Sequence, residues 1–126
     1  MNTLLVFLGA GIGGTLRHGV NLAASRLGSS FPWGTLTINI VGSILMGLVA
    51  GWFAVRGDSV QARLFIATGV LGGFTTFSTF SLDAVSMYER GETGAAAVYA
   101  LASVVAALAG LVAGLGLARA VLGGPA

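Results

Sequence analysis

The most unusual run of residues in this chain lies near its middle and reads Thr68-Gly69-Val70-Leu71-Gly72-Gly73-Phe74-Thr75-Thr76-Phe77-Ser78-Thr79-Phe80-Ser81-Leu82-Asp83. Each of the adjacent glycines Gly72 and Gly73 costs about 1 kcal/mol in a helix interior, and five hydroxyl residues and three phenylalanines follow them. Unwound backbone at membrane depth is tolerated only where it is buried in protein or lines a cavity, and broken membrane helices commonly bind ions through freed carbonyls and half-helix ends. We therefore predict a helix that is broken at the glycine pair and carries an ion path.

The side chains after the glycine pair fall into two stripes if they continue as a helix, because positions three and four apart share a face. One stripe is a polar track of Thr76, Thr79 and Asp83, and the other contains Phe74, Phe77, Ser78 and Ser81, with Phe80 at its edge. In the plainer interpretation the hydroxyls bond back to the preceding turn and the rings fill a core. The density of hydroxyl residues favours an ion path instead.

The composition of the whole chain is that of a membrane protein. Of its 126 residues, 56% are hydrophobic and 8% are charged, whereas an ordinary globular protein carries about 25% charged residues. Cysteine is absent and there is one histidine, which excludes disulfides and thiolate chemistry and disfavours a hydrolytic metal centre. The net charge of +2 is spread along the sequence and marks no nucleic-acid surface. We expect no enzymatic activity, and a chain whose surface mostly faces lipid.

The charged residues leave long neutral intervals between them, at 27–55, 64–82 and 93–118. Each interval reaches the ~20 residues that a helix needs to cross the hydrocarbon core. We predict an all-α membrane protein, a single transmembrane domain over residues 1–126, with four spans at roughly 3–24, 34–55, 63–88 and 94–121. The glycine pairs with small-xxx-small spacing predict helix packing faces, and they are Gly9/Gly13, Gly47/Gly51 and Gly110/Gly114.

The arginines give no bias for the orientation of the four spans. One side of the membrane receives Arg56, Arg63 and Arg119, and the other receives Arg26, Arg90 and, if it lies outside the membrane, Arg17. Cytoplasmic loops normally carry an excess of Lys and Arg, so a chain without that excess can insert both ways. The natural assembly of the two forms is an antiparallel homodimer. The alternative is that Arg17 lies within the membrane, which leaves a weak bias.

Three segments of the chain resemble a known family. They are Gly72–Ser81, Gly34–Asn39 and Gly13–Arg17. In order, in spacing and within the four-span frame, they closely resemble the CrcB/Fluc fluoride channels, and the match covers essentially the whole chain. The resemblance implies a dual-topology antiparallel dimer in the cell inner membrane, with two fluoride pores that let toxic cytoplasmic fluoride leave the cell and so give fluoride resistance. It also implies a structural Na⁺ at the dimer centre, held by the backbone carbonyls of Gly72 and Thr75 from each copy.

The resemblance further implies which side chains line the fluoride pore. They are Phe77, Phe80, Asn39, Thr76, Ser78, Thr79, Tyr99, Ser103 and, near a vestibule, Arg17. Phenyl rings present a positive edge, and amide and hydroxyl groups donate protons, so these residues can replace the water that fluoride must lose. Two residues depart from the family pattern: Ala107 stands where some relatives have a serine, and Asp83 stands where a glutamate is more usual.

Two of these residues also have plainer roles to weigh. Asn39 could form a hydrogen bond across a helix interface, a contact worth roughly 0.6 kcal/mol in membranes. Arg17 could be an interfacial anchor whose long side chain reaches the water.

Two other functions stay open at the level of sequence. A small multidrug-resistance-type proton-coupled exporter also has four spans, but it needs a carboxylate in the membrane, usually in the first span. Here Asp83 is the only candidate. The other possibility is a scaffold subunit of a membrane complex, which would carry no ion flux as purified protein in liposomes.

Overall fold

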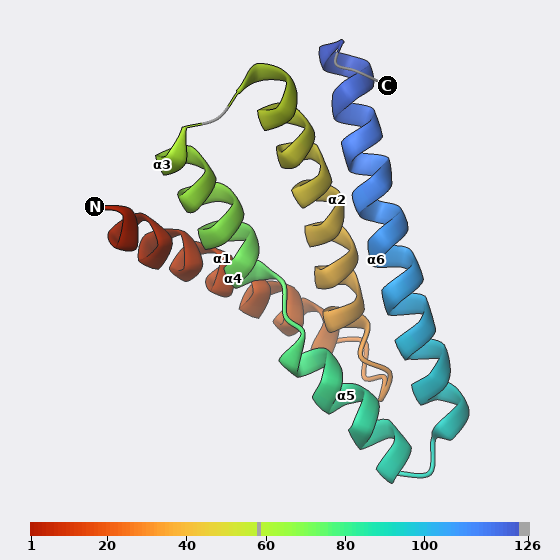
Figure 1. The fold of residues 1–126 in the computed structure, drawn as a ribbon. Helices are drawn as coiled ribbons and strands as arrows, with labels where there is room; N and C mark the ends of the chain where they lie inside the picture. The colour runs from red at the N-terminus through yellow and green to blue at the C-terminus, as the bar shows by residue number, and fades with distance from the viewer. Residues whose placement is uncertain (58, 124–126) are drawn as a thin grey trace.

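All regular elements of the chain are helices, as the computed structural model of residues 1–57 and 59–123 shows. Their order is α1 (Asn2–Ser25), α2 (Trp33–Arg56), α3 (Val60–Arg63), the π-helix η1 (Leu64–Leu71), α4 (Gly72–Phe74), α5 (Ser78–Glu89) and α6 (Thr93–Leu122) (Figure 1). Among the described residues, four segments are long and apolar enough to cross a membrane, namely Asn2–Ser25, Trp33–Arg56, Val60–Glu89 and Thr93–Leu122. The predicted all-α architecture with four apolar helical segments is confirmed.

Short turns connect the helices, and glycine makes two of them possible. Gly57 ends α2 with a φ of 80°, and Gly91 follows α5 with a φ of 83°, a region that side chains with a Cβ rarely enter. At the start of α3, the Ser59 Oγ accepts the N–H of Ala62 at 3.0 Å and so satisfies one unpaired donor of the first turn. These turns let each helix fold back against the rest of the chain (Figure 1).

Helices α2 and α6 lie side by side because glycines let their backbones touch (Figure 1). A Cβ on Gly47 would collide with the Leu111 carbonyl of α6, and a Cβ on Gly114 would collide with the Ile44 carbonyl of α2. Lipid offers no hydrophobic drive for helix association, so close backbone approach supplies the packing energy. The predicted packing faces on these two helices are confirmed.

Helix α1 makes the same kind of contact with the first half of the third segment. A Cβ on Gly13 would lie 2.8 Å from the backbone nitrogen of Phe74, and a Cβ on Gly73 would lie 2.6 Å from the carbonyl oxygen of Ala10. Gly9 and Gly69 meet in the same interface, where a Cβ on Gly9 would lie 2.9 Å from the Cα of Gly69. The predicted packing face on α1 is therefore confirmed as well.

The third segment is interrupted, but the interruption does not fall on the glycine pair. Gly72 and Gly73 are helical within α4, and the helix ends at Thr75, whose φ of −83° and ψ of 157° are extended. Helical structure resumes at Ser78. The expected break is thus displaced toward the C-terminus, because Gly73 serves close packing against α1 rather than unwinding. We call the unwound residues Thr75–Phe77 the helix break.

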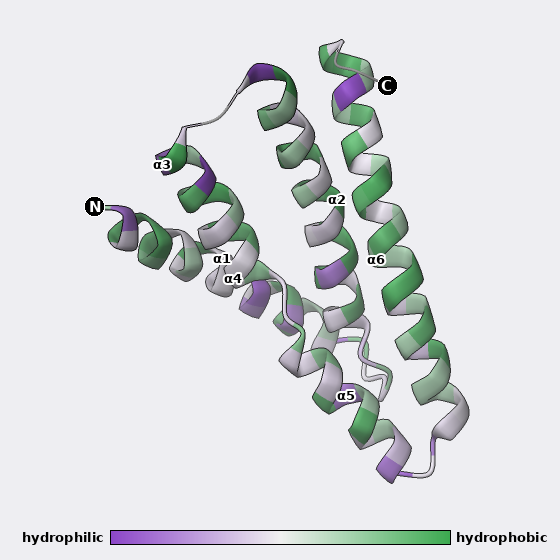
Figure 2. Ribbon diagram, in the orientation of Figure 1, coloured by the Kyte–Doolittle hydropathy of each residue, from purple (hydrophilic) through white to green (hydrophobic). Residues whose placement is uncertain are grey.

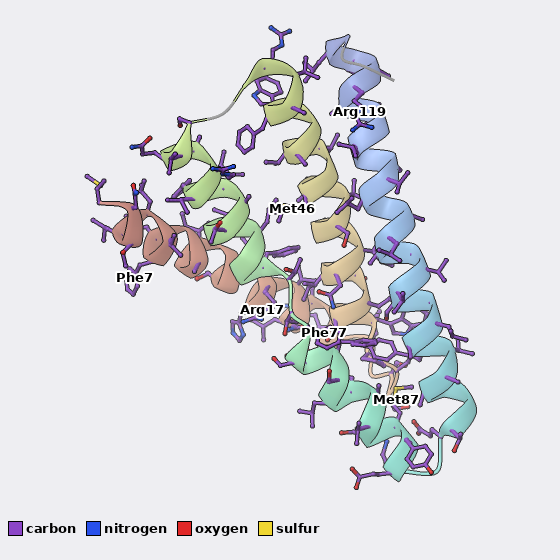
Figure 3. All side chains as sticks on the ribbon, in the orientation of Figure 1. Phe7, Arg17, Met46, Phe77, Met87 and Arg119 are labelled. Carbon is purple, nitrogen blue, oxygen red and sulfur yellow. The ribbon has the colours of Figure 1, made fainter. Side chains whose placement is uncertain are left out.

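The outward faces of the bundle are apolar. On α6, Leu101, Val105 and Val112 expose 69%, 64% and 67% of their surface, and on α1 Phe7 points away from the other helices (Figure 3). Hydrophilic residues lie mainly toward the helix ends, with a few further along α1 and α2 (Figure 2). Such a surface suits a surrounding of lipid, which rewards exposed apolar side chains rather than penalising them.

Candidate ion-binding groove

A groove of about 390 Å³ lies where the helix break faces α2 and α6. Its walls consist of Asn39, Gly42, Ser43 and Met46 from α2, Thr75, Thr76 and Phe77 from the break, Phe80 from α5, and Ser103, Val104, Ala107, Leu108 and Leu111 from α6. In Figure 3, Phe77 lies at the break and Met46 further along α2. In the single chain the groove is open and not an enclosed cavity.

Asn39, on the neighbouring helix α2, binds the backbone of the helix break. Its Nδ2 donates to the carbonyl oxygen of Thr76, and its Oδ1 accepts the backbone N–H of the same residue, both at 2.9 Å. An amide that binds both backbone groups of one residue replaces the two hydrogen bonds that unwinding removes. We call this pair of bonds the Asn39 clamp. It is the cross-interface role that the sequence left open for Asn39, here directed at the backbone of the break.

The hydroxyl of Thr76 caps the helix that follows the break. Its Oγ1 accepts the backbone N–H of Thr79 at 3.3 Å and donates to the Thr79 hydroxyl at 3.2 Å. The Ser78 hydroxyl lies 3.5 Å away. These contacts make Thr76 the centre of a small hydroxyl cluster, and they give α5 a side-chain partner for an N-terminal donor.

Two other hydroxyls follow the plainer interpretation. Thr75 Oγ1 donates to the Leu71 carbonyl, and Ser81 Oγ donates to the Phe77 carbonyl, both at 3.0 Å and both one turn back along the chain. Such local bonds occupy the hydroxyl without creating a site. The hydroxyl residues of this segment therefore divide into helix-bound groups and the cluster around Thr76.

A row of aromatic rings leads away from the groove. The rings of Phe77 and Phe80 have centroids 5.6 Å apart, and Phe80 is 5.2 Å from Tyr99. Tyr99 in turn meets Phe31, from the loop between α1 and α2, at 5.6 Å and 86°, the edge-to-face geometry that aromatic pairs prefer. Phe77 is 76% exposed, whereas Tyr99 is fully buried. The row thus runs from an open end at the break to a closed end.

Helix α6 carries two polar side chains near the groove, one with a hydrogen-bond partner and one without. The Tyr99 hydroxyl donates to Asp83 Oδ2 at 3.2 Å, which ties α6 to α5. The Ser103 hydroxyl is buried and has no hydrogen-bond partner among the described residues, although it lines the groove. Buried polar atoms are nearly always paired, so a buried hydroxyl without a partner beside a groove indicates a place for a ligand.

The sequence-predicted pore residues do not all reach the groove. Five of them line it, namely Asn39, Thr76, Phe77, Phe80 and Ser103. Four do not: Thr79 and Ser78 belong to the cluster around Thr76, Tyr99 contacts Phe80, and Arg17 is half-buried on α1. Ser43 also lines the groove but was not predicted from the sequence, although it lies one turn after Asn39 and so on the same face of α2.

The fold and the groove define a multi-pass helical membrane protein with a mostly apolar groove, lined by two phenyl rings and a few polar side chains, beside an interrupted helix. Residues 4–115 match the family described as "CrcB-like protein, Camphor Resistance (CrcB)". The chain is 65% identical over 120 residues, 94% of this chain and 97% of the relative, to the "Fluoride-specific ion channel FluC" of Methylobacterium nodulans. It is 59% identical over 121 residues, 94% of this chain and 98% of the relative, to the "Fluoride-specific ion channel FluC 2" of Nitrobacter hamburgensis. The chain belongs to the CrcB family, as its resemblance to that family predicted.

These similarities bear on the rival functions. A further relative, from Rhodopseudomonas palustris, is also called a "Fluoride-specific ion channel FluC" and is 57% identical over 123 residues, 96% of this chain and 99% of the relative. None of the three relatives carries a name that points to proton-coupled drug export, and the interpretation as a small multidrug exporter gains no support.

Proposed function

We propose that this chain forms a fluoride-selective channel of the cell inner membrane, through which toxic cytoplasmic fluoride leaves the cell. The observation that carries the proposal is the unpartnered, buried hydroxyl of Ser103 in a groove that also holds phenyl rings and the Asn39 amide. A passive pore moves fluoride down its own gradient. Because HF enters an acid-exposed cell and dissociates inside, the expected role is fluoride resistance.

The groups around the groove suit an anion that is small and strongly hydrated. Stripping water from such an ion is costly unless proton donors replace it. The Ser103 hydroxyl has no other partner, and the Asn39 Nδ2 uses one of its two N–H groups in the clamp, which leaves the second for an anion. The positive edges of Phe77 and Phe80 add an electrostatic contribution.

The residues outside the groove receive supporting roles in this proposal. The cluster of Thr76, Ser78 and Thr79 hydroxyls continues the line of donors along α5. Tyr99 lies next to Phe80 and forms the closed end of the aromatic row. Arg17 on α1 raises the local concentration of anions near a vestibule.

A second copy of the chain completes the pore. The groove is not enclosed, and Phe77 in its wall is 76% exposed, so a single chain would leave a desolvated anion facing lipid. The near-even distribution of arginines is what an antiparallel partner with the opposite orientation requires. An antiparallel homodimer has two such grooves, one from each copy, and hence two pores.

The carbonyls of Gly72 and Thr75 fit the Na⁺ proposed for the dimer centre. Oxygen ligands suit a hard cation. In an uninterrupted helix the Gly72 carbonyl would accept the Thr76 N–H, but that N–H binds Asn39. The Thr75 carbonyl would likewise accept the Thr79 N–H, which binds the Thr76 hydroxyl. Two carbonyls from each copy would surround the ion, which supplies positive charge and cross-links the two copies.

Reconstitution into liposomes tests the proposed function. Vesicles loaded with fluoride and containing the purified protein should release F⁻, measured with a fluoride electrode, while vesicles loaded with chloride retain Cl⁻. Equal release of both anions, or release of neither, contradicts the proposal. Absence of any flux would instead favour the scaffold role.

Labelling of single cysteines tests the dual topology, since the chain has no native cysteine. A cysteine at Gln61, which is exposed on α3, should react with an impermeant reagent from both sides of the membrane in comparable fractions. The control is a cysteine at Leu101, on the lipid-facing side of α6, which should not react from either side. Labelling at position 61 from one side only excludes dual insertion.

A further inference from the structure

The two carbonyls proposed for the cation lose their helical donors to two particular partners. The Thr76 N–H binds Asn39 Oδ1 at 2.9 Å instead of the Gly72 carbonyl, and the Thr79 N–H binds Thr76 Oγ1 at 3.3 Å instead of the Thr75 carbonyl. Both N–H groups thus bind side-chain acceptors in place of a backbone carbonyl, and each proposed carbonyl ligand is left without its helical donor.

The clamp contains a bond that an anion ligand does not need. An amide that only contacts an anion uses its N–H groups, and its carbonyl oxygen can point anywhere. Here the Asn39 Oδ1 accepts the Thr76 N–H, while Nδ2 donates to the Thr76 carbonyl. The bond from the Thr76 N–H to Asn39 Oδ1 fixes the backbone of the break and leaves the Gly72 carbonyl without its usual helical partner.

The clamp is anchored on a rigid support. Ile38, next to Asn39, is fully buried, and α2 is held against α6 by backbone contacts at Gly47 and Gly114. One turn beyond Asn39, a Cβ on Gly42 would collide with the Thr75 side chain, so α2 also meets the break directly. The position of the Asn39 amide relative to the break is therefore set by packing.

We infer that Asn39 and Thr76 are positioning residues for the cation at the dimer centre, in addition to any contact with the anion. The Asn39 clamp exposes the Gly72 carbonyl, and the Thr76 hydroxyl exposes the Thr75 carbonyl. The inference rests on the sodium site of the proposed function. Partners that orient the ligands of a metal usually change its affinity by about 10- to 100-fold when they are removed.

Sodium-dependent thermal stability tests this inference without measuring flux. The purified dimer is titrated with NaCl against N-methyl-D-glucamine chloride at constant ionic strength, and the unfolding midpoint is followed. A ligand that binds only the folded state stabilises it by RT ln(1 + [L]/Kd), so the midpoint begins to rise once the Na⁺ concentration exceeds the dissociation constant, and that onset concentration reports the affinity. Asn39→Leu and Thr76→Val should raise this concentration at least about tenfold.

Two matched variants serve as controls. Thr76→Ser keeps the capping hydroxyl and should retain the wild-type sodium dependence. Thr37→Val removes a hydroxyl from the exposed side of α2 and should also retain it. If Asn39→Leu does not fold, Thr76→Val decides the question, because it leaves the backbone clamp intact and removes only the cap.

The outcomes separate the inference from the proposed function. Wild-type sodium dependence in both Asn39→Leu and Thr76→Val overturns the inference, and so does a wild-type dimer that Na⁺ does not stabilise. Neither result affects the fluoride release from liposomes, which tests the channel. A weakened sodium response in these variants, together with absent fluoride release by the wild-type protein, would support the positioning role and contradict the channel.

Discussion

The α2–α6 pair and the third segment both contain glycines at helix contacts, yet only the third segment is interrupted. Gly47 and Gly114 bring two unbroken helices into backbone contact. Gly73 makes the same kind of contact with α1, and its helix still ends at Thr75, where Asn39 binds the next residue. Close packing and helix interruption are therefore separate devices. Glycine provides the first, and a polar side chain from a neighbouring helix stabilises the second.

The largest effect is expected from overfilling the α2–α6 contact. Gly114→Val places atoms against the Ile44 carbonyl and within 3.0 Å of the Leu48 nitrogen, and backbone cannot move aside as a side chain can. We expect a loss of about 3 kcal/mol or more, at the upper end for overpacked cores, seen as aggregation or a much lower unfolding temperature. Gly116→Val is the control, because nothing lies within 4 Å of a Cβ there. Equal stability of the two variants would contradict the close backbone contact between α2 and α6.

The glycine pair of the third segment should respond in opposite directions. Gly73→Ala puts a Cβ 2.6 Å from the Ala10 carbonyl and should destabilise by about 1–3 kcal/mol. Gly72→Ala meets only the Ala67 carbonyl at 3.6 Å in helical backbone, so it should stabilise by about 1 kcal/mol. Unfolding temperatures of the two variants measure this. If Gly72→Ala is as harmful as Gly73→Ala, the space beside Gly72 that is open in the single chain must be filled in the assembled protein.

Phe80, which follows the helix break, should affect flux more than stability. Phe80→Ile keeps most of the apolar volume, so stability should change by less than about 1.5 kcal/mol, but the positive ring edge is lost. Fluoride release should slow at least about tenfold, which corresponds to 1.4 kcal/mol. The matched control is Phe7→Ile, since Phe7 is 72% exposed on α1. Equal release by both variants would remove Phe80 from the pore.

The smallest effect is expected at the link between the two regions. Tyr99→Phe removes the bond from α6 to Asp83 on α5 and keeps the buried ring. The loss should be about 1 kcal/mol, the usual net value of one hydrogen bond, read from the unfolding temperature. Tyr88→Phe, at a 64% exposed ring, should change nothing. Identical behaviour of the two variants would show that α5 and α6 are joined by ring packing alone.

The four apolar segments and their packing faces could be predicted because both depend on local patterns. Long uncharged intervals fix where helices can cross lipid, and a four-residue spacing of small residues fixes which face packs. Gly9/Gly13 and Gly47/Gly51 show this directly, since a Cβ on each would strike a neighbouring helix.

The position of the break could not be predicted, because its determinant is distant in sequence. Gly72 and Gly73 signal either unwinding or close packing, and the pattern does not distinguish the two. The deciding partner, Asn39, lies 37 residues from Thr76, so spacing within the segment carries no trace of it. The π-helical form of η1 was likewise not predicted from the apolar residues 64–71.

The candidate site was only partly predictable for a related reason. Phe77 and Phe80, which the resemblance assigns to the pore, both line the groove, whereas the helical spacing after the glycine pair treats residues 74–77 as helix and puts Phe80 only at the edge of a stripe. The contact between Thr76 and Thr79 agrees with the predicted polar stripe, but the extended backbone at Thr75 ends the helix that was expected to carry Phe74 and Phe77 on one face. Whether a hydroxyl lacks a partner, as at Ser103, depends on all of its surroundings.

The clamp has a consequence for the evolutionary record of this contact. The Asn39 side chain binds only the backbone N–H and carbonyl of Thr76, and every residue except proline offers both groups. A substitution at position 76 thus creates no demand for a compensating change at position 39 as far as the clamp is concerned. The clamp by itself should therefore cause no correlated substitutions at the two positions among homologues. A contact that fixes the geometry of the break would stay invisible to any method that infers proximity from correlated substitutions.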